Sequence, residues 1–411
     1  MSKLLVAILL STILLIPLIP PFESLGYEES KTLFFITVTS FSALIWVFFR
    51  TKQSFTKTDP WIKNLVLLFI VSLGITSLLG VNPKISFFGQ APYYQSWIFY
   101  ALGGIFFFFV SLTKIKLKVW SLVLTLSSLI VAFLALKDWL LLQAGINVAT
   151  YAGRVVSSFG QPNFYAGFLL LNLPFAYYLI KSEEKILKRA GWVGMVGEVM
   201  GIIVSFSFAA IGLLGALCLG FLISRFGWKL RLLLTVVSLL VIVGSFVSSW
   251  YFLTGVAWEE LDKPPRYDWY YHEFPERGFF LWQSKWSENP EKRLYIWPVV
   301  GELIFKRPFL GYGLENMAGE VRSSSISWRH GISNLWIDRS HNYILDLLFF
   351  GGIVGLYFWI VLVWAMLKKA KGLILASLIL YLIWIQFQNQ SVVHIIYFWL
   401  LAGLIDRNDC V

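Results

Sequence analysis

The sequence is poor in charged residues and in cysteine, and both shortages exclude classes of protein. Only 14% of its 411 residues are charged, and its 2 cysteines are Cys218, in an apolar run, and Cys410. Two cysteines so placed indicate neither a disulfide framework nor a thiolate metal site. The formal net charge of +11 does not indicate nucleic-acid binding, because membrane proteins keep their basic residues in cytoplasmic loops.

The sequence motifs of several soluble enzymes are also missing. There is no P-loop, no GxGxxG placed after a strand, no HExxH zinc motif and no EF-hand spacing. The sequence therefore shows none of these nucleotide-binding or metal-binding motifs, and we predict neither a metal nor a cofactor.

Long apolar runs are what the sequence has in abundance. Hydrophobic residues make up 58% of the chain, and its mean hydropathy is +0.71. Runs of about 18 or more residues can cross a hydrocarbon core of about 30 Å. We predict an all-α integral membrane protein with about 12 transmembrane helices. The expected segments are 4–22, 32–49, 62–80, 97–113, 118–136, 163–180, 191–207, 209–224, 229–250, 342–366, 372–387 and 390–405.

Basic residues are unequally shared between the loops on the two sides of these segments. One set of short loops holds clusters such as Lys114, Lys116 and Lys118, whereas the other holds single residues such as Lys31 and Lys84. The positive-inside rule then places both chain termini in the cytoplasm. Glu28 and Glu29, the only acidic pair in the first external loop, are expected in a solvated turn; the alternative is the acidic pair of a metal- or base-using glycosyltransferase.

One long polar stretch interrupts the apolar pattern between the ninth and tenth predicted helices. We expect three parts: transmembrane helices 1–9 over 1–250, a large external loop with an amphipathic helix over 251–340, and helices 10–12 over 341–411. No Asp-x-Asp pair lies in an external loop, so a metal-bridged diphosphate is not indicated.

The junction at Ser340 carries the first candidate chemistry. Ser340 is a good N-cap, which would place His341 and Asn342 in the first turn of the helix that follows. A helix N-terminus attracts anions, and a neutral imidazole can accept a proton near neutral pH. His341 is therefore a candidate for proton-transfer chemistry on an anionic substrate. The alternative is an interfacial histidine that only caps a membrane helix.

Arg154 and Asn163 form a second candidate, just before the sixth predicted helix. The guanidinium of Arg154 offers a fixed fork of donors that suits a diphosphate. We expect Asn163 to cap the helix and to direct its amide into the same cavity. The alternative is an interfacial arginine that extends to the lipid headgroups.

A third candidate lies in the external loop, at 293–316. Apolar residues at helical spacing follow Arg293 and Pro298, and Pro298 fits the first turn of a helix. We expect this helix to lie on the outer membrane surface and to end in a turn at Gly311 and Gly313. Arg293 would meet a phosphate at the start of the helix, or it is a solvated surface arginine.

These stretches together resemble one enzyme family. His341-Asn342 followed by Gly352 and Gly355 resembles the HN-x9-G-x-x-G signature of O-antigen ligases. The stretches at Arg154 and Arg293 resemble two further patterns of that family, in the same order. The resemblance implies a bacterial multi-pass glycosyltransferase of the plasma (inner) membrane, with its active site on the external (periplasmic) side.

The resemblance also implies substrates and roles. A glycan on a polyprenyl diphosphate would be transferred to an acceptor hydroxyl, with inversion and without a metal. His341 would be the general base, and Arg154 and Arg293 would neutralise the diphosphate. The further candidates for substrate binding are Asn163, Asn342, Arg339 and Arg266. The partners implied are the donor, a glycan or lipid-linked acceptor and membrane lipids, but no nucleic acid.

One expected family element is absent. Relatives carry a Ser-Arg-small pattern near the seventh and eighth helices, where this sequence has Phe206 between two serines. Arg266 or Arg339 could replace the missing arginine. Three acceptors stay open: a lipid-linked core sugar (a ligase), a growing polysaccharide (a polymerase) and a protein side chain. A transporter of lipid-linked glycan or solute is the alternative from another class.

Three further polar features fall within apolar segments or between them. Glu198 lies inside the seventh segment, where a carboxylate is usually functional or paired or, with shifted boundaries, interfacial. His394 lies near the external end of the last helix and could approach the site. The polar corner at 386–390 is explained by hydrogen bonds across a tight hairpin.

Overall fold

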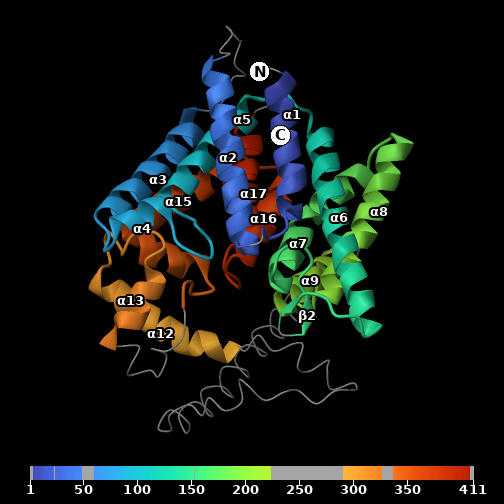
Figure 1. The fold of residues 1–411 in the computed structure, drawn as a ribbon. Helices are drawn as coiled ribbons and strands as arrows, with labels where there is room; N and C mark the ends of the chain where they lie inside the picture. The colour runs from blue at the N-terminus through green and yellow to red at the C-terminus, as the bar shows by residue number, and fades with distance from the viewer. Residues whose placement is uncertain are drawn as a thin grey trace.

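The chain is described here by a computed structural model. It covers residues 3–22, 24–48, 60–151, 153–223, 290–325 and 337–407, and the structural statements below concern these ranges. Over them the fold is almost wholly helical, with one two-stranded antiparallel ribbon (Figure 1).

The first half of the chain alternates long apolar helices with short polar connections. Its elements are α1 (Lys3–Leu15), the 3-10 turn η1 (Ile16–Leu18), α2 (Tyr27–Phe48), α3 (Pro60–Leu78), α4 (Pro83–Phe88), α5 (Trp97–Leu112), α6 (Leu117–Gln143), β1 (Thr150–Tyr151) and β2 (Arg154–Val155).

The second half continues in the same way. Its elements are α7 (Pro162–Ile180), α8 (Lys185–Val204), α9 (Phe208–Ile223), α12 (Pro290–Lys306), α13 (Met317–Ser323), α15 (Tyr343–Lys369), α16 (Gly372–Trp384) and α17 (Val392–Asp406). In the ribbon, Thr150 pairs with Val155 and Tyr151 with Arg154.

The protein is an integral membrane protein. In the described ranges 5 helices, α2, α3, α6, α7 and α15, are long and apolar enough to cross a membrane. The shorter apolar helices are α1, α5, α9, α16 and α17. Each predicted segment within the described ranges corresponds to a helix, whereas 229–250 lies outside them. The total of about 12 crossings stays a prediction.

α17 is the centre of the bundle. Every residue from Val392 to Asp406 is buried, so this helix is covered on all sides by others. Gly103 of α5 permits part of this packing, because a Cβ there would come within 2.2 Å of the indole nitrogen of Trp399. A central helix that is buried on every side is what a multi-helix membrane bundle requires.

The two ends of the bundle differ. Figure 1 shows both chain termini at one end, and α4, α12, α13 and β2 at the other. This arrangement agrees with the prediction that both termini lie on one side of the membrane. Which side is cytoplasmic stays a prediction.

The expectation of a solvated turn at Glu28 and Glu29 is wrong. Both side chains are buried. Glu29 accepts a hydrogen bond from the Gly26 N–H at 2.7 Å, and Glu28 accepts one from the Val392 N–H at 2.7 Å. The first N–H groups of a helix have no intrahelical acceptor. Glu28 supplies one and so connects the start of α2 to the start of α17.

Glu198 is internal, not interfacial. Its side chain is fully buried, and Oε1 accepts a hydrogen bond from the Ser128 hydroxyl at 2.5 Å. The carboxyl group therefore connects α8 to α6 inside the bundle, which agrees with the paired alternative.

Candidate functional site

Helix α15 is broken at Gly352. The backbone there has φ 59° and ψ −164°, which is not helical. A break inside a membrane helix leaves N–H and C=O groups that lipid cannot satisfy. Another part of the protein must therefore provide their partners.

The turn at 308–313, which follows α12, provides them. The carbonyls of Phe349 and Phe350 accept bonds from the N–H groups of Tyr312 (2.8 Å) and Gly313 (2.9 Å). On the other side of the break, Ile353 N–H donates to Pro308 O at 2.8 Å and Val354 N–H to Phe309 O at 3.2 Å. These 4 hydrogen bonds replace the interrupted ladder of the helix.

Glycine is required on both sides of this contact. A Cβ on Gly352 would lie 2.2 Å from Phe309 O, and one on Gly311 would lie 2.5 Å from Phe349 O. Both residues also have positive φ, which glycine adopts without strain. Two sequence stretches that were singled out separately, around Gly311 and Gly352, are therefore one structural unit.

The N-terminus of α15 lies two residues later than expected. Asn342, not Ser340, is the N-cap, because its Oδ1 accepts bonds from Ile344 N–H (3.0 Å) and Leu345 N–H (3.1 Å). His341 therefore precedes the helix instead of lying in its first turn. It has φ 60° and is partly buried. Such left-handed backbone is uncommon outside glycine and is often found at functional sites.

Ser340 fixes the backbone next to His341. Its N–H donates to Asp346 Oδ1 at 2.7 Å, and its hydroxyl accepts from the Asn342 N–H at 3.2 Å. Its carbonyl accepts from the indole N–H of Trp297 on α12 at 2.9 Å. The segment that carries His341 is thus held from α15 and from α12. The amphipathic helix α12 begins at Pro290, so Pro298 lies inside it and not in its first turn as expected.

Arg339 lies in a buried charged cluster. Its guanidinium pairs with Glu315, donates to Gln95 Oε1 at 3.1 Å and lies 4.8 Å from the ring centre of Tyr93. Arg339 and Glu315 are both almost fully buried. Glu315 also has positive φ, at 64°. Arg339 was predicted to bind substrate, but here Glu315 already occupies its guanidinium.

Several acids share this one arginine. Burial raises the pKa of the Glu315 carboxyl above its ordinary value, and the charge of Arg339 offsets this only in part. Burial alone would lower the pKa of Arg339, but Glu315, Asp338 and Asp346 outweigh it and raise that pKa. The arginine is therefore always charged, whereas the acids compete for it.

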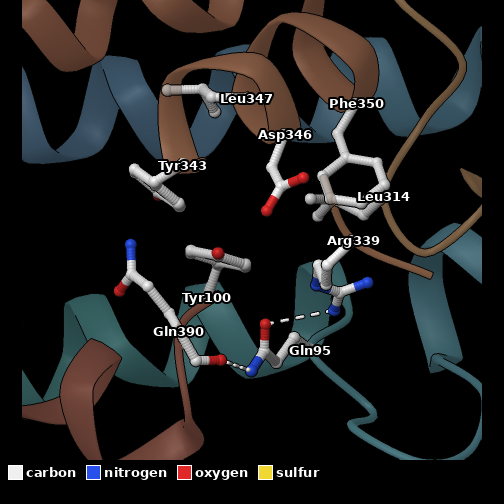
Figure 2. A pocket seen from close by; sticks show the side chains of 9 residues that line it. All are labelled: Gln95, Tyr100, Leu314, Arg339, Tyr343, Asp346, Leu347, Phe350 and Gln390. Atoms are coloured by element: carbon white, nitrogen blue, oxygen red, sulfur yellow. Dashed lines mark hydrogen bonds between the residues drawn. The ribbon is translucent and has the colours of Figure 1, made fainter. Parts of the chain in front are cut away.

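A small cavity borders the cluster. It is about 10 Å³, roughly the room one water molecule needs. Figure 2 shows Asp346 pointing from α15 into the space above Tyr100, with Arg339 and Gln95 beside it. The complete lining is Gln95, Tyr100, Leu314, Arg339, Tyr343, Asp346, Leu347, Phe350 and Gln390.

The polar corner after α16 does more than close a hairpin. Gln390 accepts from the Tyr381 hydroxyl at 2.6 Å through its side chain, and its carbonyl accepts from the Gln95 amide at 2.8 Å. Asn389 donates to the Tyr93 hydroxyl at 2.9 Å. The corner therefore connects the loop before α5 to the end of α16, and the hairpin explanation was incomplete.

Arg154 and Asn163 do come together. Arg154 Nη1 donates to Asn163 Oδ1 at 3.2 Å, and both side chains are buried. Asn163 was expected to cap α7, but Gln161 is the N-cap residue and Asn163 lies within the helix. Its side chain supports Arg154 instead. Arg154 Nη1 also lies 3.5 Å from the carbonyl of Phe206, so it reaches the turn that lacks the family's arginine.

His394 lies between the region around Arg154 and the end of α16. It is fully buried, and its ring centre is 6.1 Å from that of Phe164, the neighbour of Asn163. On the other side its ring centre is 6.1 Å from that of Trp384, at the end of α16.

The connection continues to the His341 segment. Just beyond Trp384, the carbonyl of Gln386 accepts from the Asn342 amide at 3.3 Å, and that of Ile385 accepts from the Tyr343 N–H at 3.0 Å. The α16–α17 hairpin thus connects the Arg154 region to the His341 region through contiguous contacts.

Two predicted residues are not placed. Arg293 lies on the first turns of α12, but its side chain is outside the described part of the chain, and Arg266 is wholly outside it. Conversely, sequence reasoning missed Glu315 and gave Asp346 no role. A signal for Glu315 existed, because an acid two residues after the Gly-x-Gly turn lies close in sequence to a loop that carries the candidate arginines.

These observations define an integral membrane protein with a charged site at the end of its bundle opposite the termini. A comparison with protein families narrows the class, because the model of the O-antigen ligase family matches residues 189–360. Residues 189–360 are therefore similar to the O-antigen ligase domain. The match includes the stretches around Arg293 and His341, whereas Arg154 and Asn163 precede it. A comparison with curated proteins gave no match.

Proposed function

We propose that the protein is a membrane glycosyltransferase that transfers a glycan from a polyprenyl diphosphate to an acceptor hydroxyl. The observation that carries the proposal is the O-antigen ligase match over 189–360, which includes the whole His341–Gly355 stretch. The local geometry adds support, because His341 stands on strained backbone that Ser340, Asp346 and Trp297 hold in place.

In this proposal His341 acts as the general base. An imidazole nitrogen takes the proton of the acceptor hydroxyl as its oxygen attacks the anomeric carbon of the donor. The bond between that carbon and the diphosphate oxygen breaks, and the diphosphate leaves with the electron pair. The configuration at the anomeric carbon is inverted. Removing such a base is expected to slow transfer by about 10²–10⁴-fold.

The leaving diphosphate needs positive charge. We assign this role to Arg154 and Arg293, since fixed guanidinium groups stabilise developing phosphate charge without a metal. Asn163 holds the Arg154 fork in place through the 3.2 Å bond. Arg339 can bind a phosphate only if that anion displaces Glu315, so we assign it to the support of the His341 segment. Arg266 is the remaining cationic candidate in the external loop.

The proposed division of the chain follows from these roles. The helices of 1–250 and 341–411 would hold the lipid part of the donor, and 251–340 would cover the polar site on the external side of the plasma membrane. Asn342 belongs to the site through the backbone that it caps next to His341.

The test is transfer by the purified, reconstituted protein from a synthetic polyprenyl diphosphate glycan. Three acceptors are compared: a lipid-linked core oligosaccharide, a second carrier-linked glycan and a serine-containing peptide. We expect transfer to one of them, and transfer that persists in EDTA. Accumulation of donor or solute in vesicles without a new glycosidic bond would overturn the proposal in favour of a transporter.

A further inference from the structure

The last turn of α12 and the turn that follows it expose two large apolar side chains. Phe305 is 85% exposed and Phe309 is 68% exposed. Their neighbours Leu78 and Leu79, at the end of α3, and Ile353 on α15 are exposed as well. We call these five residues the Phe305 patch. On a water-facing surface such a cluster is unfavourable, and it marks an interaction site.

Hydrogen bonds fix the patch to two candidate membrane spans. The Arg307 guanidinium Nη2 donates to the Leu79 carbonyl at 3.2 Å, and Phe309 O accepts from Val354 N–H at 3.2 Å. The segment from Phe305 to Phe309 therefore lies at the depth of the end of α3 and of the break in α15.

The length of α15 shows how deep in the membrane the break at Gly352 lies. Lys368 marks the far end of the helix, where its ammonium group lies 3.5 Å from the ring centre of Trp364, an arrangement typical of a membrane interface. Gly352 lies about 24 Å from Lys368 along the helix at about 1.5 Å per residue. A hydrocarbon core of about 30 Å then extends about 6 Å beyond Gly352.

α3 gives an independent estimate. Its far end carries Trp61, which is exposed, and Leu79 lies about 27 Å away along the helix. Both helices therefore place the Phe305 patch just inside the hydrocarbon boundary on the side of α12 and α13. Backbone groups at this depth must be satisfied within the protein, and the N–H and C=O groups left open at Gly352 all bond to the 308–313 turn.

We propose that the Phe305 patch inserts into the lipid acyl chains of that leaflet and anchors α12 to the membrane surface. Arg307, with its guanidinium 5.5 Å from the ring centre of Tyr312, and Lys306 lie beside the patch and suit lipid phosphates. Because Trp297 of the same helix bonds to Ser340 O, the inserted patch holds the His341 segment at the height of the lipid headgroups.

Spin labels on the full-length protein test this proposal. Phe305 and Phe309 are changed singly to cysteine in a Cys218→Ser/Cys410→Ser background. The protein is placed in vesicles of phosphatidylcholine and phosphatidylglycerol. Collision of the label with oxygen, which concentrates in lipid, is compared with collision with a water-soluble nickel chelate. Tyr357→Cys, on the exposed face of α15, is the lipid reference, and Ser323→Cys, exposed on α13, is the water reference.

We expect labels at 305 and 309 to match the Tyr357 reference, with high oxygen and low nickel collision. Nickel collision at the level of the Ser323 reference would overturn the proposal, because the patch would then face water. An immobilised label that neither reagent reaches would also overturn it, since the patch would then be covered by protein. Both sites are highly exposed, so the substitutions leave the fold intact, and none of these outcomes depends on glycan transfer.

Discussion

Gly352→Ala tests the contact between α15 and the 308–313 turn. At this position alanine adopts φ 59° and ψ −164° only with strain, and its Cβ would overlap the Phe309 carbonyl at 2.2 Å. Backbone in this region costs a residue other than glycine about 1–3 kcal/mol. The protein must either accept that strain and the overlap or let the turn separate from the helix.

Separation of the turn is also unfavourable. It breaks 4 hydrogen bonds and lets a continuous α15 regain two of its own. The net loss of two bonds amounts to about 1–3 kcal/mol. The steric overlap adds to the first cost, and the unsatisfied groups of the separated turn add to the second. In either case we expect the free energy of unfolding to fall by about 2–4 kcal/mol. For a chain of this length, this corresponds to a fall of about 2–5 °C in apparent melting temperature.

Gly355→Ala is the matched control. A Cβ at Gly355 would make an ordinary contact of 3.6 Å with Leu73, and Gly355 has helical backbone. Alanine is a better helix former than glycine by about 1 kcal/mol, so this variant should melt at the same temperature or slightly higher. Melting is followed by size-exclusion chromatography of heated, detergent-solubilised protein. Equal melting of the two variants would refute the role assigned to the break.

Three further predictions concern the His341 region. Asn342→Ala should lower the free energy of unfolding by about 0.5–2 kcal/mol because it removes the cap of α15, whereas Asn342→Asp should keep the cap. If both variants melt at the wild-type temperature, the capping role is contradicted. Burial raises the pKa of Glu315 above 4.5, so wild-type stability should fall as pH rises through that raised pKa. Glu315→Gln should remove this dependence, and an unchanged pH profile of melting would contradict it. Trp297→Phe removes the 2.9 Å bond to Ser340 O, worth about 0.5–1.5 kcal/mol. It should lower the maximal transfer rate several-fold with unchanged donor KM and protein yield, and a change in donor KM alone would contradict the positioning role.

The helices were the most predictable part of the fold. Apolar runs define them, and each run within the described ranges is a helix. The errors lie where local pattern competes with distant partners. Segment 4–22 ends as a helix at Leu15, because Pro17 and the prolines after it favour a tighter turn and extended chain. The break at Gly352 was invisible because its partners lie far away in sequence, in the 308–313 turn.

The site was predicted in part. The residue types and their order along the chain indicated Arg154, Asn163 and His341 as candidates, and Arg154 does contact Asn163. The capping roles were wrong at Ser340 and at Asn163, since several polar residues compete for each helix N-terminus and only tertiary contacts decide between them. Glu28 was misjudged for the same reason, because its partner on α17 is remote in sequence.

The most direct test of the central claim is the rate of a single turnover by His341→Ala, with the polyprenyl diphosphate glycan already bound. The account predicts unchanged donor affinity and a transfer rate lowered by about 10²–10⁴-fold, as loss of a general base requires. Transfer at the wild-type rate by a well-folded variant would contradict the account, and a loss of donor affinity alone would move His341 from catalysis to binding.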